Sequence, residues 1–336
     1  MIFVTGGTGM LGSYLLFELL KTNKHIRASK RTASSFNTTK RIFRALSSDI
    51  DILFSKIEWV DVDLFDQNSI ENSLNGVTEV YHCAAYISDS SKNKNKLVEN
   101  NQLITEAVVN AALNKKIEKF CHVSSISALG NSSNNKLITE ETLWKEHKNN
   151  STYSTSKYLS EMEVWRGMAE GLNAVIINPS VILGVGDWSK GSANLFDKIN
   201  KGLKFYTHGS SGFVDAKDVV SIMLRLMDEE SSFNQRYIVS AENLDFKFLF
   251  EQLASALGVS TPQIYATPLL TQLAWRAEYL ISLLLNKEAL ITKESARTAH
   301  KKLKYDNNKI LGIIDFKYKK ISNTVNSIAD FYMEDH

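Results

Sequence analysis

The sequence Thr5-Gly6-Gly7-Thr8-Gly9-Met10-Leu11-Gly12 decides how the rest of the chain is interpreted. It follows a short apolar run, Ile2 to Thr5, and opens a helical stretch, Leu11 to Leu20. Glycines allow a tight turn and let a phosphate approach bare backbone, while the unpaired amides at the start of a helix attract its charge. A strand, a glycine-rich turn and a helix in this order predict a dinucleotide-binding unit. The residues expected to hold the cofactor here are Gly6, Thr8, Gly9, Met10, Leu11 and Gly12.

Outward from this turn, short β-branched runs alternate with helical stretches, which predicts an α/β fold with a Rossmann-type doubly wound parallel sheet. The further strands are expected at His25 to Ser29, Ile57 to Val62, Glu79 to Cys83, Lys119 to Ser124 and Ala174 to Asn178. After Pro179 the alternation fades, and residues 189–206 and 246–304 have a helical pattern with no strand rhythm. We expect a cofactor domain at 1–185, to which 213–240 return as a loop, a helix and a strand. A smaller, mostly helical C-terminal substrate domain is expected within 186–336, mainly at 186–212 and 241–305.

Composition excludes several classes of protein. Of 336 residues, 43% are hydrophobic and 23% are charged, which is typical of a globular protein and not of a disordered or fibrous one. The balance of 39 basic and 37 acidic residues gives no reason to expect a nucleic-acid partner. Cys83 and Cys121 both lie in apolar runs, so they predict neither a disulfide framework nor a metal site. A cytoplasmic location is the expectation.

The longest apolar stretch, Leu269 to Leu285, is interrupted by Gln272, Arg276 and Glu278. Charges of this kind are costly at the centre of a bilayer, so we expect no membrane span. The stretch is interpreted as an amphipathic helix that packs against the rest of the protein, with a membrane-surface role as the alternative.

The end of the second strand bears on which dinucleotide binds. A carboxylate about 20 residues after the glycine turn would hold the ribose 2′-hydroxyl of NAD. No acidic residue occurs between Glu18 and Asp49, and the strand ends in Arg27-Ala28-Ser29-Lys30-Arg31. A guanidinium with hydroxyls nearby suits a 2′-phosphate. The sequence therefore favours NADP over NAD, with a solvated basic turn as the alternative.

Tyr153 and Lys157 lie four positions apart at the start of a predicted helix, so they share one face. A cation beside a phenol stabilises the phenolate, which makes the pair a proton donor or acceptor for a carbonyl or an alcohol. The fifth strand ends in Ser124 and Ser125, at the sheet edge where open α/β sheets bind ligands. Each feature alone is common on protein surfaces, and only the combination predicts a catalytic site.

The glycine turn, the serines and the Tyr-Lys pair occur in the order and approximate spacing of the extended short-chain dehydrogenase/reductase superfamily, also called the NAD-dependent epimerase/dehydratase family. The sequence resembles this family over nearly its full length and is closest in motifs to its dihydroflavonol-reductase-like branch. The resemblance, aligned on Gly130, implies that Ser125 is the catalytic hydroxyl and Ser124 its neighbour against the cofactor. It also implies that Tyr153 transfers the proton and that Lys157 holds the nicotinamide ribose.

Other parts of the chain resemble the family as well. Asn101 and Thr105 match its Asn-x-x-x-Thr segment, and Gly184-Val185 stands where Gly-Pro is usual, a departure expected to loosen that turn. The additional cofactor contacts that the resemblance implies are Asp63 and Leu64 at the adenine, Cys83, Ala84 and Ala85 along the fourth strand, and Pro179, Val181 and Ile182 near the nicotinamide.

Two residues bear on the reaction. Arg31 matches the NADP-binding arginine of the dihydroflavonol-reductase and cinnamoyl-reductase branch, and Ser211 stands where nucleotide-sugar enzymes usually carry an arginine for the diphosphate. We therefore expect NADPH-dependent reduction of a ketone or aldehyde, or the reverse oxidation of an alcohol, on a small hydrophobic substrate. The alternatives are a nucleotide-sugar epimerase or dehydratase with tightly bound NAD, and an NADP-binding regulatory protein without turnover.

The resemblance also implies a homodimer. Leu97 to Leu113 and Tyr153 to Gly167 correspond to helices through which family members commonly pair. The partners expected are thus a small-molecule substrate and a second copy of the chain.

Overall fold

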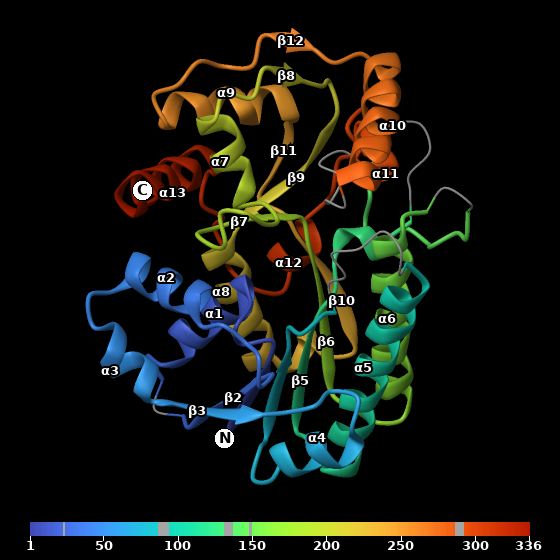
Figure 1. Ribbon diagram of the computed structural model, residues 1–336. Helices are drawn as coiled ribbons and strands as arrows, with labels where there is room; N and C mark the ends of the chain where they lie inside the picture. Colours follow the sequence, from blue (N-terminus) through green and yellow to red (C-terminus); the bar gives the residue numbers. More distant parts are fainter. Residues whose placement is uncertain (23, 87–93, 131–136, 148–149, 286–291) are drawn as a thin grey trace.

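The centre of the fold is a parallel sheet with helices on both faces (Figure 1). The computed structural model describes residues 1–22, 24–86, 94–130, 137–147, 150–285 and 292–336. Within this part, seven strands pair in the order β10-β6-β5-β4-β1-β2-β3. They are β1 (Ile2–Thr5), β2 (Ile26–Lys30), β3 (Ile57–Asp61), β4 (Glu79–His82), β5 (Lys119–Val123), β6 (Ala174–Pro179) and β10 (Gln235–Val239).

All six strands expected in the first half are present, with ends that differ by one residue at most. Alternate residues of each strand serve different cores, as the two-residue period of a strand requires. Ile2 and Val4 pack in one core, whereas Phe3 packs in the other. The predicted fold class, a Rossmann-type doubly wound sheet, is confirmed.

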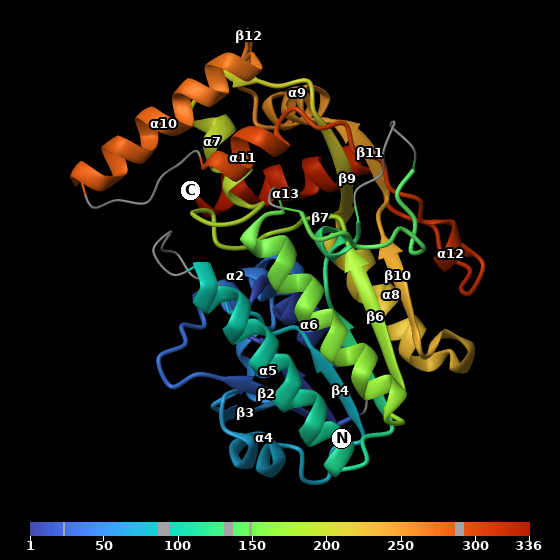
Figure 2. The ribbon, with the colours of Figure 1, turned by 90° about the vertical axis from the view of Figure 1, so that its right-hand side faces the viewer.

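Each face of the sheet has its own set of helices, and Figure 2 shows α5 and α6 side by side on one of them. The first face is covered by α1 (Met10–Leu19), α2 (Asn37–Leu46), α3 (Ile50–Ser55) and α8 (Ala216–Asp228). The second is covered by α4 (Gln67–Ser73), α5 (Lys94–Asn114) and α6 (Thr152–Ala169). The short helices η2 (Ile126–Ala128) and η3 (Glu230–Ser232) follow β5 and α8.

Most of the C-terminal part lies beyond the carboxyl ends of the strands, at the top of Figure 1. A three-stranded sheet, β11-β9-β7, joins it to the main sheet, and β12 pairs with β8 at its outer edge. Its elements are β7 (Val181–Leu183), α7 (Asn194–Asn200), β8 (Phe205–Tyr206), β9 (Ser210–Asp215), β11 (Glu242–Asp245), α9 (Phe246–Ala256), β12 (Ile264–Tyr265), α10 (Pro268–Leu285), α11 (Lys293–Thr298), α12 (Asn308–Leu311) and α13 (Ile321–Asp335).

Residues 246–304 are mostly helical as expected, in α9, α10 and α11, but they also contain the two-residue strand β12. Residues 189–206 end in the two-residue strand β8, which the sequence pattern did not predict. The expectation of a loop at residue 213 was wrong, because this residue lies inside β9. The sequence of β9, Ser-Ser-Gly-Phe-Val-Asp, has little strand propensity. It pairs with β11 on one side and β7 on the other, and glycine at 212 allows close packing, because a Cβ there would lie 2.9 Å from the Cβ of Ser180. Among the described residues, no helix has the length and apolarity needed to cross a bilayer.

Candidate active site

The glycine turn packs closely against the end of β4. Gly6 has φ +72°, and a Cβ there would lie 2.7 Å from the main-chain nitrogen of Ala84. A Cβ at Gly12 would collide with the carbonyl oxygen of Gly6. The turn therefore requires glycine at both positions, because a Cβ at either would collide with main-chain atoms and Gly6 also has a positive φ.

The amino terminus of α1 is open to an anion. Gly9 is its N-cap residue, no side chain caps it, and the first turn contains no acidic residue. The amides of this turn and the positive end of the helix dipole therefore suit a pyrophosphate. These features fit the dinucleotide that the sequence predicts.

Ser125, Tyr153 and Lys157 are brought to the carboxyl end of β5. Ser125 directly follows that strand and caps η2, where its Oγ accepts a hydrogen bond from the Ser127 amide at 3.1 Å. Tyr153 lies in the first turn of α6 with an exposed side chain. The buried Lys157 Nζ donates to the carbonyl oxygen of Val123, the last residue of β5, at 3.1 Å.

A hydrogen bond joins the two segments that carry these residues. Ser154 Oγ, next to Tyr153, donates to the carbonyl oxygen of Ser127 at 2.6 Å. The start of α6 is therefore fixed to the loop that contains Ser125.

This group lies at the same sheet edge as the glycine turn. The positive charge of Lys157 lowers the pKa of His82, at the end of β4, and that of the Cys83 thiol, although burial has the larger effect on both groups. Cys83 is in turn the residue against which a Cβ at Gly6 would lie, 2.8 Å from its carbonyl carbon. A continuous path of neighbours thus leads from the phosphate-binding turn to Lys157.

Asn101 and Thr105, on α5, fix the segment after β4. Asn101 Nδ2 donates to the carbonyl oxygen of Tyr86 at 2.9 Å and to Ser156 Oγ at 2.9 Å. Thr105 Oγ1 lies 3.3 Å from His82 Nε2. Because Ser156 precedes Lys157, the Asn-x-x-x-Thr pair connects the fourth strand to α6. Cys83 and Ala84 are half-buried along this path and Ala85 is exposed.

The sequence analysis missed a buried carboxylate, Glu161, one turn after Lys157 on α6. Its Oε2 accepts hydrogen bonds from Ser124 Oγ at 2.7 Å and Asn178 Nδ2 at 2.8 Å. Its Oε1 accepts from Arg236 Nη1 at 2.9 Å and Trp165 Nε1 at 3.3 Å. The side chain is completely buried, and its charge is balanced by Arg236 and stabilised by three further donors.

This network bears on two expectations. Asn178 Nδ2 also donates to the carbonyl oxygen of Ser125 at 3.0 Å, which links the buried charge to the serine that the resemblance implies is catalytic. Ser124 is 3% exposed, and its hydroxyl donates to Glu161, so the hydroxyl points into the protein interior. The side chain of Ser124, a residue expected against the cofactor, therefore makes its hydrogen bond within the protein. The signal in the sequence was the spacing of Tyr153, Lys157 and Glu161, which places all three on one helix face.

Two stacked histidines lie beneath Lys157. The rings of His82 and His122 are 5.2 Å apart, and both are buried. His82 Nδ1 lies 2.7 Å from Thr5 Oγ1. Burial, with a smaller effect from Lys157, lowers the pKa of His82 to about 3. Burial, followed by the charges of His82 and Lys157, lowers the pKa of His122 well below its usual value. Both rings are therefore neutral at physiological pH.

Arg31 follows β2 with an exposed side chain. The neighbouring Lys30 Nζ forms an ion pair with Asp61 at 2.6 Å, and this hydrogen bond lowers the pKa of the Asp61 carboxyl. The Asp61 carboxylate, opposite the end of β2, is thus paired with Lys30. Arg31 makes no ion pair within the described ranges. Asp63 and Leu64 follow β3, where Asp63 is exposed and Leu64 is half-buried.

The segment after β6 places Pro179 in the interior and leaves Val181 and Ile182 half-buried. The turn at Gly184-Val185 is not loose, because the Val185 amide donates to the hydroxyl of Tyr14 at 2.8 Å. Proline lacks this N–H, so valine makes a bond that the usual Gly-Pro could not.

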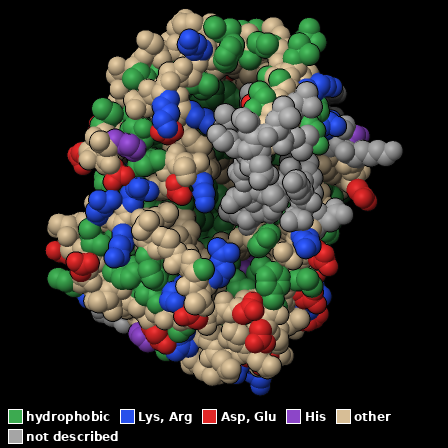
Figure 3. Space-filling model, viewed as in Figure 1, with side chains coloured by type: hydrophobic (Ala, Val, Ile, Leu, Met, Phe, Trp, Pro, Cys, Tyr) green, Lys and Arg blue, Asp and Glu red, His purple; other side chains and the backbone are tan. Residues whose placement is uncertain are grey.

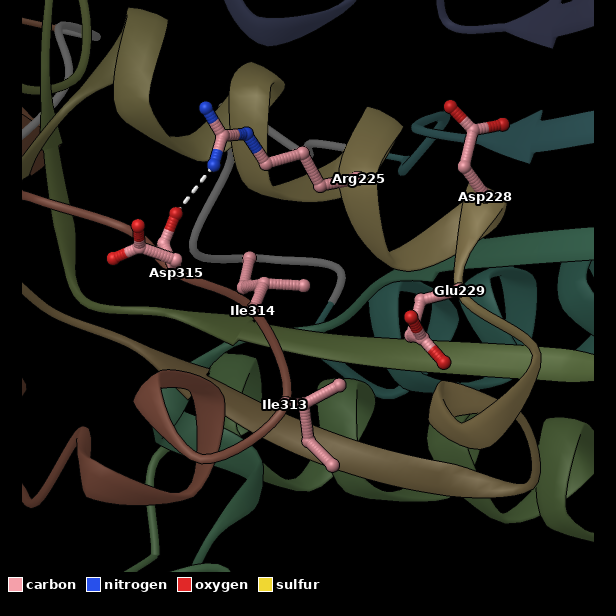
Figure 4. Close-up of a pocket in the computed structure, with 6 residues that line it drawn as sticks. All are labelled: Arg225, Asp228, Glu229, Ile313, Ile314 and Asp315. Carbon is pink, nitrogen blue, oxygen red and sulfur yellow. Dashed lines mark hydrogen bonds between the residues drawn. The ribbon is translucent and has the colours of Figure 1, made fainter.

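A pocket of about 460 Å³ lies elsewhere, between the end of α8 and the segment after α12 (Figure 4). It is lined by Arg225, Asp228, Glu229, Ile313, Ile314 and Asp315. Arg225 donates to the main-chain carbonyl of Asp315 across it. This pocket contains none of the site residues expected from the sequence. The described residues include no cluster of His, Cys, Asp and Glu side chains that could hold a metal ion.

Known proteins resemble the chain in both sequence and structure. It is 27% identical over 278 residues to a sterol demethylase protein B of Methylococcus capsulatus, covering 80% of this chain and 78% of that protein. It is 24% identical over 314 residues to a putative dihydroflavonol 4-reductase of Synechocystis, covering 91% and 87%. The UDP-glucose 4-epimerase of Thermotoga maritima shares the fold with a TM-score of 0.76 at 15% identity, covering 99% of each chain.

A family model gives the assignment. The model of the NAD-dependent epimerase/dehydratase family matches residues 2–240, which include the glycine turn, Ser125, Tyr153 and Lys157. Relatives in this group include reductases, epimerases and dehydratases. The chain therefore belongs to the NAD-dependent epimerase/dehydratase family.

Proposed function

We propose that this protein is an NADP-dependent oxidoreductase that reduces a ketone or aldehyde on a small hydrophobic substrate, or oxidises the corresponding alcohol. The observation that carries the proposal is the position of Ser125, Tyr153 and Lys157 at the sheet edge that also holds the glycine turn. Reductase names among the relatives, such as cinnamoyl-CoA reductase 1 of Petunia hybrida, agree with this chemistry.

The roles of the residues follow from their chemistry. A nicotinamide bound at this edge would supply hydride to the carbonyl carbon. The Tyr153 hydroxyl donates its proton to the substrate oxygen, and Lys157 stabilises the phenolate that remains. Ser125 Oγ donates a hydrogen bond to the same oxygen as negative charge develops, an effect worth about 2.7–4 kcal/mol for one donor in well-studied enzymes.

NADP is favoured by the charges after β2. Lys30 is paired with Asp61, whereas the exposed Arg31 has a free guanidinium fork available for a 2′-phosphate within the described structure. Asp61 does not present an unpaired carboxylate to a ribose, because Lys30 lies 2.6 Å from it. These features support NADP over NAD.

The surroundings of Ser211 argue against a nucleotide-sugar substrate. Ser211 is buried in β9, and residues 301–303 pair alongside this strand through the amides of Ser210 and Leu303. A diphosphate would meet neither an arginine at 211 nor open space there. We propose that residues 186–212 and 241–305 instead provide an apolar substrate pocket, and that the protein is a homodimer.

The variant Tyr153→Phe tests the proposal. We expect it to bind NADPH with unchanged affinity and to lose nearly all turnover with hydrophobic ketones and aldehydes. Tyr158→Phe on the same helix is the control, because Tyr158 stacks on Trp144 at 4.6 Å and takes no part in the chemistry. Full activity of Tyr153→Phe would refute the mechanism. Bound NAD with conversion of nucleotide-sugars would favour an epimerase, and NADPH binding without any turnover a regulatory protein.

A further inference from the structure

Helix α10 has an unusual amount of exposed apolar surface. Leu269 is 71% exposed, Leu273 58%, Tyr279 49% and Ile281 48%, although the sequence pattern predicted that this helix packs against the protein. Figure 2 shows α10 extending away from the rest of the molecule. Thr271 holds its first turn: this residue is buried, and its Oγ1 lies 3.0 Å from His300 Nε2. The helix is thus anchored near its beginning, and exposed apolar side chains recur from Leu269 to Ile281 among its described residues.

The exposed surface continues onto the neighbouring two-stranded sheet. Ile264 of β12 pairs with Phe205 of β8, and these side chains are 46% and 45% exposed. Leu269, Leu273 and Ile281 lie on one side of α10, and we call the surface formed by Phe205, Ile264, Leu269, Leu273 and Ile281 the apolar ridge. Large contiguous apolar surfaces on a folded protein mark sites of interaction with another protein or a membrane.

The segments of the chain that contain the apolar ridge have an excess of basic residues. Residues 194–208 and 259–305 carry ten basic and four acidic residues, whereas the rest of the chain carries 29 and 33. Lys204 and Arg276, both exposed, lie in or beside the elements of the ridge. In Figure 3, hydrophobic side chains and Lys or Arg side chains are interspersed at the upper end of the molecule, where β8, β12 and α10 lie in Figure 1.

We propose that the apolar ridge binds the surface of an anionic lipid membrane. Interfacial helices insert their apolar side chains among the lipids while Lys and Arg contact the headgroups, and tyrosine is favoured at this depth. Protein interfaces, in contrast, are depleted of lysine. The excess of positive charge in this part of an almost neutral chain complements a negative surface, so a membrane fits better than a second copy of the same cationic face.

Flotation of the full-length protein with lipid vesicles tests the proposal. One set of vesicles contains phosphatidylcholine alone, and the other contains phosphatidylcholine with phosphatidylserine. We expect binding to the anionic vesicles, weaker binding to the neutral ones, and a loss of binding when the salt concentration is raised from 0.1 to 0.5 M, about the range over which surface charges become screened.

Variants locate the binding surface. Leu269→Ser combined with Leu273→Ser should weaken binding to anionic vesicles at least tenfold, because two leucine side chains no longer gain free energy by moving from water into the lipid. Ile52→Ser combined with Leu311→Ser is the control, because these side chains are 61% and 43% exposed on α3 and α12. Thermal unfolding verifies that each variant is folded, and sedimentation velocity gives its mass.

Three results would overturn the proposal: no binding to either vesicle, equal loss of binding in the control, or dissociation of a dimer by the leucine substitutions. The last would assign the ridge to a second copy of the chain.

Discussion

Replacement of Glu161 by glutamine tests whether the buried network at the end of β5 stabilises the fold. Glutamine has the shape of glutamate, but one of its two terminal atoms is an NH₂ donor. Each oxygen of Glu161 accepts from two donors, so either orientation of the amide places its NH₂ against two other donors. Arg236, whose side chain is 14% exposed, also loses its counter-charge.

The magnitude follows from these losses. Removal of one partner of a buried ion pair costs about 3–5 kcal/mol. Glu170→Gln, on the same helix, is the matched control: Glu170 is 49% exposed and pairs with Arg166 at 2.9 Å, and such a pair contributes about 0–1 kcal/mol. Urea unfolding followed by circular dichroism, with the denaturant slope unchanged, gives both values. If Glu161→Gln costs no more than Glu170→Gln, the carboxylate does not hold these strand ends together.

Three further outcomes can be checked by binding and unfolding measurements. Arg31→Ala should weaken NADP binding about 10–100-fold, the value of one or two charge-assisted hydrogen bonds, and leave NAD binding unchanged. Lys56→Ala is the charge-matched control, and equal effects on both cofactors would contradict a 2′-phosphate contact. Val185→Pro should lower the free energy of unfolding by about 1–3 kcal/mol, because proline removes the amide that donates to the buried Tyr14 hydroxyl. An unchanged thermal midpoint would show that this bond is not needed. Burial raises the pKa of Asp218 to about 6, so the folded protein keeps a proton that the unfolded chain releases near pH 4, and stability declines from pH 4 to 6. Asp218→Asn should remove this decline and be about 1 kcal/mol more stable at pH 7.5, after allowance for partial exposure, yet equal to the wild type at pH 4; parallel pH profiles would exclude Asp218 as the source.

The sequence analysis succeeded where local pattern and structure agree. The strand, glycine turn and helix at residues 2–20 form as expected, because the packing of Gly6 and Gly12 leaves no alternative residue. The positions of Tyr153 and Lys157 on one face of α6 follow from helix geometry alone.

It failed where distant parts of the chain decide the environment. In the sequence Glu161 looks like an ordinary carboxylate on a helix. Its charge is stabilised in the interior by Arg236, which lies 75 residues later in the chain. The resemblance separated Ser125 from Ser124 but did not reveal that the Ser124 hydroxyl donates to that carboxylate, whereas the Ser125 hydroxyl caps η2. The apolar pattern of α10 predicted a packed helix, whereas the partner that would cover it is not supplied by the described part of this chain.

The strand order has a practical consequence for dividing this protein into fragments. The last strand of the main sheet, β10, pairs with β6 across five register positions, and α8 covers β5 and β6 from the first face. A fragment that stops at residue 185 would expose the unpaired edge of β6 together with the apolar face beneath α8, a combination that promotes aggregation. Expression of a stable cofactor-binding half therefore requires residues 216–239 to be joined to it through a linker that replaces the intervening chain.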